Sequence, residues 1–403
     1  MQRAKTRKSY QGFTLVEVVA VMALFMTVLI IAAQTFNTVI TLSKKYSKSE
    51  ESNIEGIIGL EVLRHDLEQM GFGLYWGYLP GSGITYGELT DASDATNDAP
   101  SNVPRACVFR NNSAAFLSDM IGVKGTTVGR AKPSQLWTYI SFHNVSSSSS
   151  WSSLPIKWPA KNLKSAPNPD KVIAVRHNFN DSSDDHLLLL DSSGKFEFDF
   201  NSNGSIPVMY LPTKDQQVSM VYGVGSYDAS TPLRMPFNRS DFFISTSSVP
   251  KFCAVRTGVL EKATVSHGNG GYNYIPLLDC VADMQVVLGW DVSNGGNAKS
   301  ISAYSNADGS SVNGDATFSD VQGWLASPLG IREHLKIIKV YILAQEGRKD
   351  PKYLYPAASM VVGNEYNGET PLTKTYTFTT AQLQYHWKLY RVIVKPKNLA
   401  NNQ

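Results

Sequence analysis

The hydrophobic pattern of this chain is uneven, because one long apolar run stands near its start and only short runs follow. The long run covers residues 13–33, and one of its residues is charged. At about 1.5 Å per residue, a helix of this length spans roughly 30 Å, the thickness of the hydrocarbon core of a bilayer. The pattern therefore predicts a membrane-spanning helix near the amino terminus.

Apolar residues then recur near helical spacing as far as Met70, which predicts one continuous helix over residues 13–70. Gly56 and Gly59 are its weak points, since each costs about 1 kcal/mol relative to alanine. We expect the apolar stripe of the second half to pack against a sheet. The stripe consists of Ile54, Ile57, Ile58, Leu63, Leu67 and Met70.

From Gly71 onward the pattern changes to short alternating runs separated by connectors rich in Asp, Ser, Asn and Gly, including residues 294–315. The chain is therefore predicted to be α+β, with a long N-terminal hydrophobic helix packed on a C-terminal globular domain of antiparallel sheet with large loop insertions. No internal repeat or boundary divides residues 71–403. The candidate strands are Ala106–Phe109, Leu136–Phe142, Val172–Val175, Leu187–Leu190, Val208–Leu211, Val218–Val224, Phe242–Ser245, Cys253–Val259, Met284–Trp290, Leu335–Leu343, Lys374–Phe378 and Trp387–Val394.

Charge fixes the expected orientation of the membrane helix. The first twelve residues carry four basic residues and no acid, whereas the remainder holds 33 basic and 34 acidic residues. The positive-inside rule keeps the start of the chain in the cytoplasm and exports everything after Ala33. The nearly neutral remainder offers no general attraction to nucleic acid, so no nucleic-acid partner is predicted.

Glu17 interrupts the apolar run. An ionisable group at the centre of a membrane helix costs about 2.5–3.5 kcal/mol, and less near its end. A carboxylate in such a position needs a specific cationic partner. A plain single-pass anchor would not need this residue.

The junction before and around Glu17 reads Gly12-Phe13-Thr14-Leu15-Val16-Glu17 after a short basic leader. It resembles the prepilin signature of type IV pilins and type II secretion pseudopilins. The resemblance implies that residues 1–12 are a leader, that prepilin peptidase cleaves between Gly12 and Phe13, and that Phe13 becomes N-methylated. It also implies that Glu17 pairs with the terminal ammonium of a neighbouring subunit and sets its register.

Further segments resemble PilW-like minor pilins: residues 63–73, 276–291, 337–343 and 390–395. These matches are short, and Cys280 stands where that family usually has glycine. With the N-terminal signature they cover about a quarter of the chain. Residues 90–252 match nothing recognisable and are expected to hold insertions.

The sequence contains no HExxH, GxSxG, GxxxxGK[ST], CxxC or GxGxxG motif, so no enzyme activity, metal or cofactor is predicted. The histidines are scattered singly. Asp184, Asp185 and His186 are adjacent, and neighbours along a chain do not converge on one metal. The acidic and amide residues of two loops are interpreted as turn formers rather than calcium ligands. They are Asp91, Asp94 and Asp98, and Asn306, Asp308, Asn313 and Asp315.

Three cysteines lie in the part predicted to be exported, where disulfides form. Cys253 with Cys280 is the pair favoured by the predicted strands, and closing that loop would add about 3.5 kcal/mol in the chain-entropy model. Cys107 bonded to either of them, or three free thiols, remain alternatives.

The hypothesis drawn from the sequence is a PilW-like minor pilin that supports or primes assembly of a type IV pilus. It would sit in the bacterial inner membrane through residues 13–33, with a periplasmic C-terminal domain, and later in the pilus at the cell surface. Expected partners are major and minor pilins, prepilin peptidase and the inner-membrane assembly platform. Alternatives are a J-type minor pseudopilin of a type II secretion system, or a pilus-borne adhesin that uses loops within residues 90–169.

Overall fold

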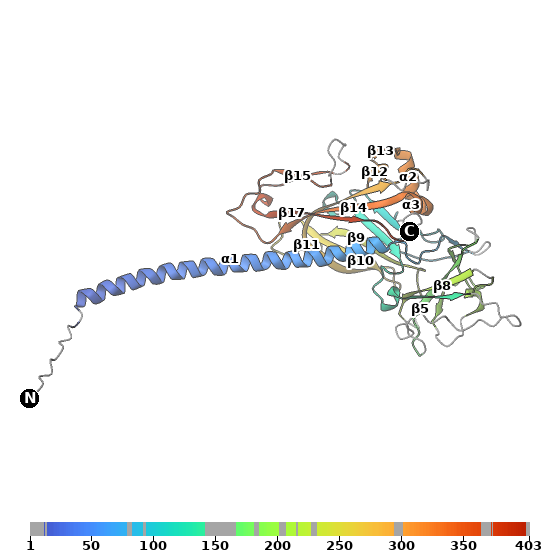
Figure 1. Ribbon diagram of the computed structural model, residues 1–403, viewed down its shortest axis with the longest axis horizontal. Helices are drawn as coiled ribbons and strands as arrows, with labels where there is room; N and C mark the ends of the chain where they lie inside the picture. Colours follow the sequence, from blue (N-terminus) through green and yellow to red (C-terminus); the bar gives the residue numbers. More distant parts are fainter. Residues whose placement is uncertain are drawn as a thin grey trace, which may run out of the picture.

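The computed structural model describes residues 12, 14–78, 83–91, 94–141, 167–180, 185–200, 207–214, 217–226, 232–293, 301–363, 372 and 374–399. Helix α1, Leu15–Gln69, extends from the β-rich part as a long rod (Figure 1). Its 55 residues correspond to roughly 80 Å. The chain leaves the helix through Gly71, whose φ of +79° is readily adopted by glycine.

Only the last part of α1 packs on the β-rich part. Its buried face is formed by Leu60, Leu63, Leu67 and Met70, which recur every three or four residues. Ile54, Ile57 and Ile58 are exposed instead, so the prediction that the whole stripe packs on a sheet is wrong for these three. The contact with the sheet already begins at buried Gly56, so Ile57 and Ile58 are exposed because they lie outside the face of the helix that packs on the sheet.

The large sheet has nine strands, and its main path runs β13-β12-β11-β10-β9-β3-β2, with β14 joining β11 and β17 joining β14. All of its pairs are antiparallel. The 19-residue β11 is the centre, because β10 pairs with its first half while β12 and β14 pair with its second half. The nine strands are β2 Cys107–Arg110, β3 Met120–Gly125, β9 Asn238–Ser245, β10 Gly258–Val265, β11 Tyr272–Trp290, β12 Ala303–Asn306, β13 Val312–Gly314, β14 Leu335–Glu346 and β17 His386–Val394.

A second sheet of six strands follows the order β1-β6-β5-β8-β4, with β7 paired to β5. Strands β4 to β8 lie in sequence between β3 and β9, which are neighbours in the large sheet, so this sheet is built mainly from an insertion. It has a hydrophobic cluster of its own. A separate two-stranded ribbon pairs β15 Ser359–Val361 with β16 Thr375–Thr377. The six strands are β1 Gly77–Tyr78, β4 Trp137–Ser141, β5 Lys171–Asn178, β6 Leu187–Leu188, β7 Glu197–Asp199 and β8 Gln217–Gly225.

The predicted α+β fold class, a long apolar helix followed by a β-rich globular part, is confirmed. Three local predictions are wrong. Residues Val208–Tyr210 form a 3-10 turn rather than a strand, and β10 begins at Gly258 rather than at Cys253. The connector predicted over residues 294–315 contains the β12–β13 hairpin, and two short helices, α2 Phe318–Ala326 and α3 Pro328–His334, were not predicted.

Candidate functional site

The start of α1 is held by a side-chain cap. Thr14 is the N-cap, and its hydroxyl accepts a hydrogen bond of 3.3 Å from the backbone N–H of Glu17. This satisfies one of the free donors at the helix start, and the acid itself complements the positive end of the helix dipole. Gly12 lies in open space, where an added Cβ would meet no atom within 4 Å. Phe13, the predicted site of N-methylation, lies outside the described residues.

Helix α1 exposes a span of apolar side chains long enough to cross a bilayer. The span, Leu15–Ser43, has 29 residues, none of them buried in the β-rich part, and Glu17 is its single charged residue. Its threonine hydroxyls, including those of Thr27 and Thr35, donate to carbonyls three or four residues earlier in the helix. Because these polar groups are satisfied within the helix, the span suits an apolar environment.

The C-terminal part of α1 is fixed to the sheet by close packing, an ion pair and a backbone hydrogen bond. A Cβ added at Gly59 would overlap the carbonyl oxygen of Leu277 in β11, so glycine permits the close approach here. Buried Asp66 pairs with Lys262 of β10 at 2.5 Å. Near the carboxyl end of the chain, the backbone N–H of Lys397 donates to the carbonyl of Glu68 at 2.9 Å. The helix is therefore attached to both β10 and β11 and to the last segment of the chain.

An apolar groove of about 440 Å³ runs beside this attachment. It is lined by Ile58, Gly59 and Val62 of the helix and by residues 275–279 of β11. The side chains of Ile54, Ile57 and Ile58 beside the groove are exposed. A polar and charged stretch, residues 44–53, separates these isoleucines in sequence from the exposed apolar span.

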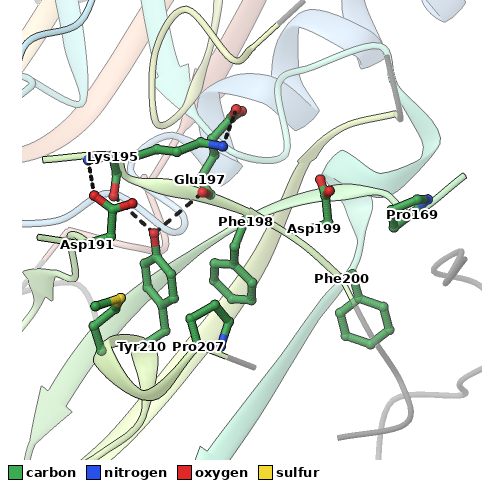
Figure 2. Close-up of a pocket in the computed structure, with 10 residues that line it drawn as sticks. Pro169, Asp191, Lys195, Glu197, Phe198, Asp199, Phe200, Pro207 and Tyr210 are labelled. Carbon is green, nitrogen blue, oxygen red and sulfur yellow. Dashed lines mark hydrogen bonds and ion pairs between the residues drawn. The ribbon is translucent and has the colours of Figure 1, made fainter. Parts of the chain in front are cut away.

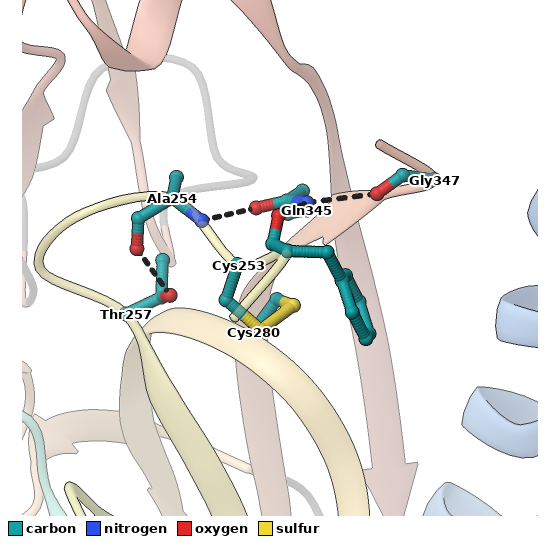
Figure 3. The surroundings of a disulfide bond; sticks show 7 residues. Cys253, Ala254, Thr257, Cys280, Gln345 and Gly347 are labelled. Atoms are coloured by element: carbon teal, nitrogen blue, oxygen red, sulfur yellow. Dashed lines mark hydrogen bonds between the residues drawn. A yellow bond between two sulfur atoms is a disulfide. The ribbon is translucent and has the colours of Figure 1, made fainter. Parts of the chain in front are cut away.

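A disulfide joins Cys253, in the loop before β10, to Cys280 of β11 (Figure 3). Cys280 has a φ of +56° and lies where the register of β11 with β10 shifts. The adjoining loop is also held by Gln345, whose Oε1 accepts the N–H of Ala254 at 2.7 Å. Cys107 is a buried free thiol, and burial raises its pKa.

In the small sheet, a cavity of about 440 Å³ lies around β7 and Tyr210 (Figure 2). The Tyr210 hydroxyl donates to the carbonyl of Lys195 at 3.0 Å, and the Lys195 ammonium lies 3.5 Å from the carboxylate of Glu197. Phe198 stacks on Tyr210 at 4.3 Å, and both rings are buried. These groups mainly bind one another, which indicates a structural role.

The loop with Asp94 and Asp98 is held by buried ion pairs. Lys124 of β3 lies 2.6 Å from Asp98 and 2.8 Å from Glu88, and Arg239 of β9 lies 2.8 Å from Glu88. Burial alone would raise the pKa of Asp98, but the charges of Lys124 and Arg105, together with hydrogen bonds from both residues, outweigh burial and lower that pKa. Asp94 accepts from the backbone N–H of Thr96. These acids therefore bind protein cations and turn donors.

Within the described residues, one group of side chains lies close enough to share a metal ion: His177, Asp185 and His186. In the sequence, Asp185 and His186 stand beside Asp184, which is outside the described residues, and these three neighbours were not expected to bind a metal. His177 was not expected to join them, because it reaches them only across a hairpin. Pairing β5 with β6 in the correct register would have revealed it.

Comparison with known proteins gives two matches. The family described as the prokaryotic N-terminal methylation motif matches residues 7–33. Among solved structures, the chain is similar to a type IV-like pilin from Thermus thermophilus, with 14% sequence identity, a TM-score of 0.21, and coverage of 41% of this chain and 80% of that chain. No curated protein matches the chain.

Because the TM-score is only 0.21, this structural similarity carries no weight. The assignment rests on the N-terminal motif and on the architecture described above. The matched residues include the Gly12–Phe13 junction, Glu17 and residues 15–33 of the exposed span. Behind them stands a β-rich part that carries no recognised catalytic motif. The motif and the helix-then-sheet architecture together support a type IV pilin-like protein, a structural subunit of the pilin type.

Proposed function

We propose that this chain is a PilW-like minor pilin, a scarce subunit that supports or primes assembly of a type IV pilus. The observation that carries the proposal is the exposed apolar span Leu15–Ser43, whose single charge is Glu17 and whose residues 15–33 belong to the matched N-terminal motif. A helix of this kind is unfavourable in water, so it needs either lipid or other apolar helices around it. The membrane surrounds the helix with lipid before assembly, and the filament surrounds it with other apolar helices afterwards.

The proposed processing acts at the start of this helix. Prepilin peptidase removes residues 1–12 by cleaving between Gly12 and Phe13, and Phe13 is then N-methylated. The new terminal ammonium of one subunit pairs with Glu17 of a neighbour. This pair lowers the cost of burying Glu17 and fixes the axial position of one helix against the next.

Size favours a minor subunit over the repeated one. The small sheet is an insertion between β3 and β9, and Figure 1 shows its strands β5 and β8 on the far side of the β-rich part from the projecting end of α1. Such bulk would crowd a helical array in which every subunit is identical. The inserted sheet has room at the tip of the filament or in a priming complex. The partners there would be major and minor pilins and the inner-membrane platform.

The rival function is that of a J-type minor pseudopilin in a type II secretion system, which would share the N-terminal motif. Deletion of the gene, with surface piliation and exoprotein export scored in the same strain, separates the two. Our proposal expects loss of pili with export intact, restored by the wild-type gene on a plasmid. Loss of export with normal piliation would assign the chain to secretion.

A pilus-borne adhesin is the other alternative, and the inserted sheet gives it a structural basis. Within the region named for it, residues 90–169, residues 92–93 and 142–166 lie outside the described residues. If a strain producing the chain with that loop shortened still forms pili but no longer adheres to surfaces, adhesion becomes its main role. Unchanged adhesion leaves assembly as the function.

A further inference from the structure

The loop end of the hairpin formed by β5 and β6 gathers two imidazoles and a carboxylate. Val175 pairs with Leu188, and Arg176 pairs with Leu187. One further step along this antiparallel register places His177 opposite His186. The two rings meet in a T-shaped arrangement with their centroids 4.0 Å apart.

Asp185 lies against both rings. Its Oδ2 is 2.7 Å from Nδ1 of His186, and its Oδ1 is 3.6 Å from Nδ1 of His177. One ligand atom from each of the three residues lies within 4.8 Å of the others. The three side chains are largely buried, with exposed fractions of 18% for His177, 23% for Asp185 and 22% for His186.

The surrounding structure holds two of these side chains in place. The backbone N–H groups of Asn178 and His186 donate to Oδ1 of Asp185, at 3.1 and 2.9 Å, and so orient its carboxylate. The Trp76 ring stacks nearly parallel on the His186 ring, with their centroids 3.6 Å apart. The backbone N–H of Trp76 also donates to the carbonyl of His186 at 2.7 Å. Hydrogen-bonded carboxylates and fixed rings are typical of the supports around metal ligands.

One polar atom of the cluster is left without a partner among the described residues. Nε2 of His177 is buried and makes no hydrogen bond. A buried imidazole nitrogen without a partner is unfavourable in a purely hydrogen-bonded cluster. A bound ion would relieve this, either by coordinating Nε2 or by re-orienting the ring.

We propose that His177, Asp185 and His186 form a binding site for a divalent first-row transition ion, with Zn²⁺ as the representative case. Imidazole nitrogen and carboxylate oxygen are zinc ligands at about 2.0–2.2 Å, which places tetrahedral ligand atoms about 3.3 Å apart. The 2.7 Å between His186 Nδ1 and Asp185 Oδ2 therefore has to widen by roughly half an ångström. Three protein ligands leave a fourth position for water. The ion would fasten the hairpin end beside Trp76, where the chain leaves α1 for the small sheet.

Zinc titration of untagged, metal-free, full-length protein in detergent at pH 7.5 tests the site by calorimetry. We expect one Zn²⁺ per wild-type chain and loss of that uptake in Asp185→Asn and His177→Ala. His65→Ala and His386→Ala, which change histidines outside the cluster, serve as matched controls and should keep it. Circular dichroism without metal checks that each variant is folded.

Cobalt gives a second readout that does not depend on the stability of His177→Ala. Co²⁺ added to the wild type should produce visible absorption bands of a low-coordinate nitrogen–oxygen site, and folded Asp185→Asn should lack them. Absence of stoichiometric zinc uptake by the wild type would overturn the proposal. Equal uptake by the wild type and folded Asp185→Asn would also overturn it, because the three residues would then be only a hydrogen-bonded cluster.

Discussion

Glu17 is the side chain of the exposed span whose chemistry conflicts with an apolar surrounding. It lies in the first turn of α1, where its backbone N–H is capped by Thr14 and its charge complements the helix dipole. That local role explains why the helix tolerates an acid there. An acid could play the same local role in an ordinary membrane anchor, so the role does not distinguish a pilin from such an anchor. The proposed pairing with a neighbouring ammonium adds a role that appears only on assembly.

Glu17→Gln should leave processing intact and reduce incorporation into pili by about tenfold, because a charge-assisted hydrogen bond contributes about 1.5–3 kcal/mol. The ratio of the subunit in sheared pili to that in membranes measures the effect. Thr27→Val is the matched control, since the Thr27 hydroxyl donates within its own helix at 2.7 Å. Normal incorporation of Glu17→Gln would contradict the pairing.

Gly59 tests the attachment of α1 to the sheet. Gly59→Ala forces a methyl group into the carbonyl of Leu277, and overpacking of this kind costs about 1–3 kcal/mol. Denaturant unfolding should therefore show a lower free energy of unfolding. Gly323→Ala in α2 is the control: its added methyl meets no atom within 4 Å, so helix propensity should raise stability by up to about 1 kcal/mol. Equal effects of the two changes would mean that the close approach is not needed.

His267 gives a pH dependence with a definite sign. It is partly buried, its Nε2–H donates to Oδ1 of Asn238 at 3.0 Å, and its Nδ1 accepts the backbone N–H of Arg234 at 3.3 Å, so the neutral ring fits the site. Burial lowers its pKa from 6.5 to about 4. Below pH 6.5 the unfolded chain therefore binds more protons than the folded chain, and stability falls until the pH reaches about 4.

From this residue we expect a loss of about 2–3 kcal/mol in the free energy of unfolding between pH 7 and 4.5. His267→Gln should remove that part of the pH dependence, because glutamine does not titrate. The measurement is denaturant unfolding at both pH values. His65→Gln, at a position exposed on α1, is the control and should retain the loss.

At the scale of elements, the helix was easier to predict than the strands. A continuous apolar run and its helical continuation gave α1 to within a residue or two, since nothing in the sequence interrupts them before Gly71. Val208–Tyr210 was predicted as a strand because a short apolar run does not distinguish a strand from a buried turn. The β12–β13 hairpin was missed because its polar residues resemble a loop.

The candidate site likewise has one part that the sequence could predict and another that it could not. The junction around Gly12 and Glu17 is a local motif and is visible in the sequence. The groove beside Gly59 and the cluster around His177 depend on which strand lies next to which, and that information is not local. Exposure of Ile57 and Ile58 was also hidden, because the helix faces the sheet here with its glycines, Gly56 and Gly59, rather than with these isoleucines.

The exposed isoleucines provide a prediction for the helix as an element. Ile58 is 63% exposed beside the apolar groove, so Ile58→Asp should change the free energy of unfolding by no more than about 0.5 kcal/mol. If neighbouring subunits cover this face, the variant should enter sheared pili several-fold less well. Leu354→Asp, at a 69% exposed position outside the helix, is the control and should assemble normally. Normal assembly of Ile58→Asp would show that the groove is not a subunit contact.

The whole molecule combines the long helix α1 with a β-rich part that contains an inserted sheet. The two sheets share a hydrophobic core, since Val224 of β8 and Phe242 of β9 belong to one cluster. The insertion is therefore integrated with the large sheet and is positioned firmly relative to α1. This arrangement suits a subunit that places a bulky part at a fixed position on a filament.

The central claim is that this chain is processed and assembled as a pilin, and mass spectrometry of the native protein tests it most directly. Protein recovered from membranes and from sheared pili should begin at Phe13, with one methyl group on its amine and residues 1–12 absent. A strain without prepilin peptidase should keep those residues. Recovery of the uncut chain from a strain with active peptidase would contradict the account.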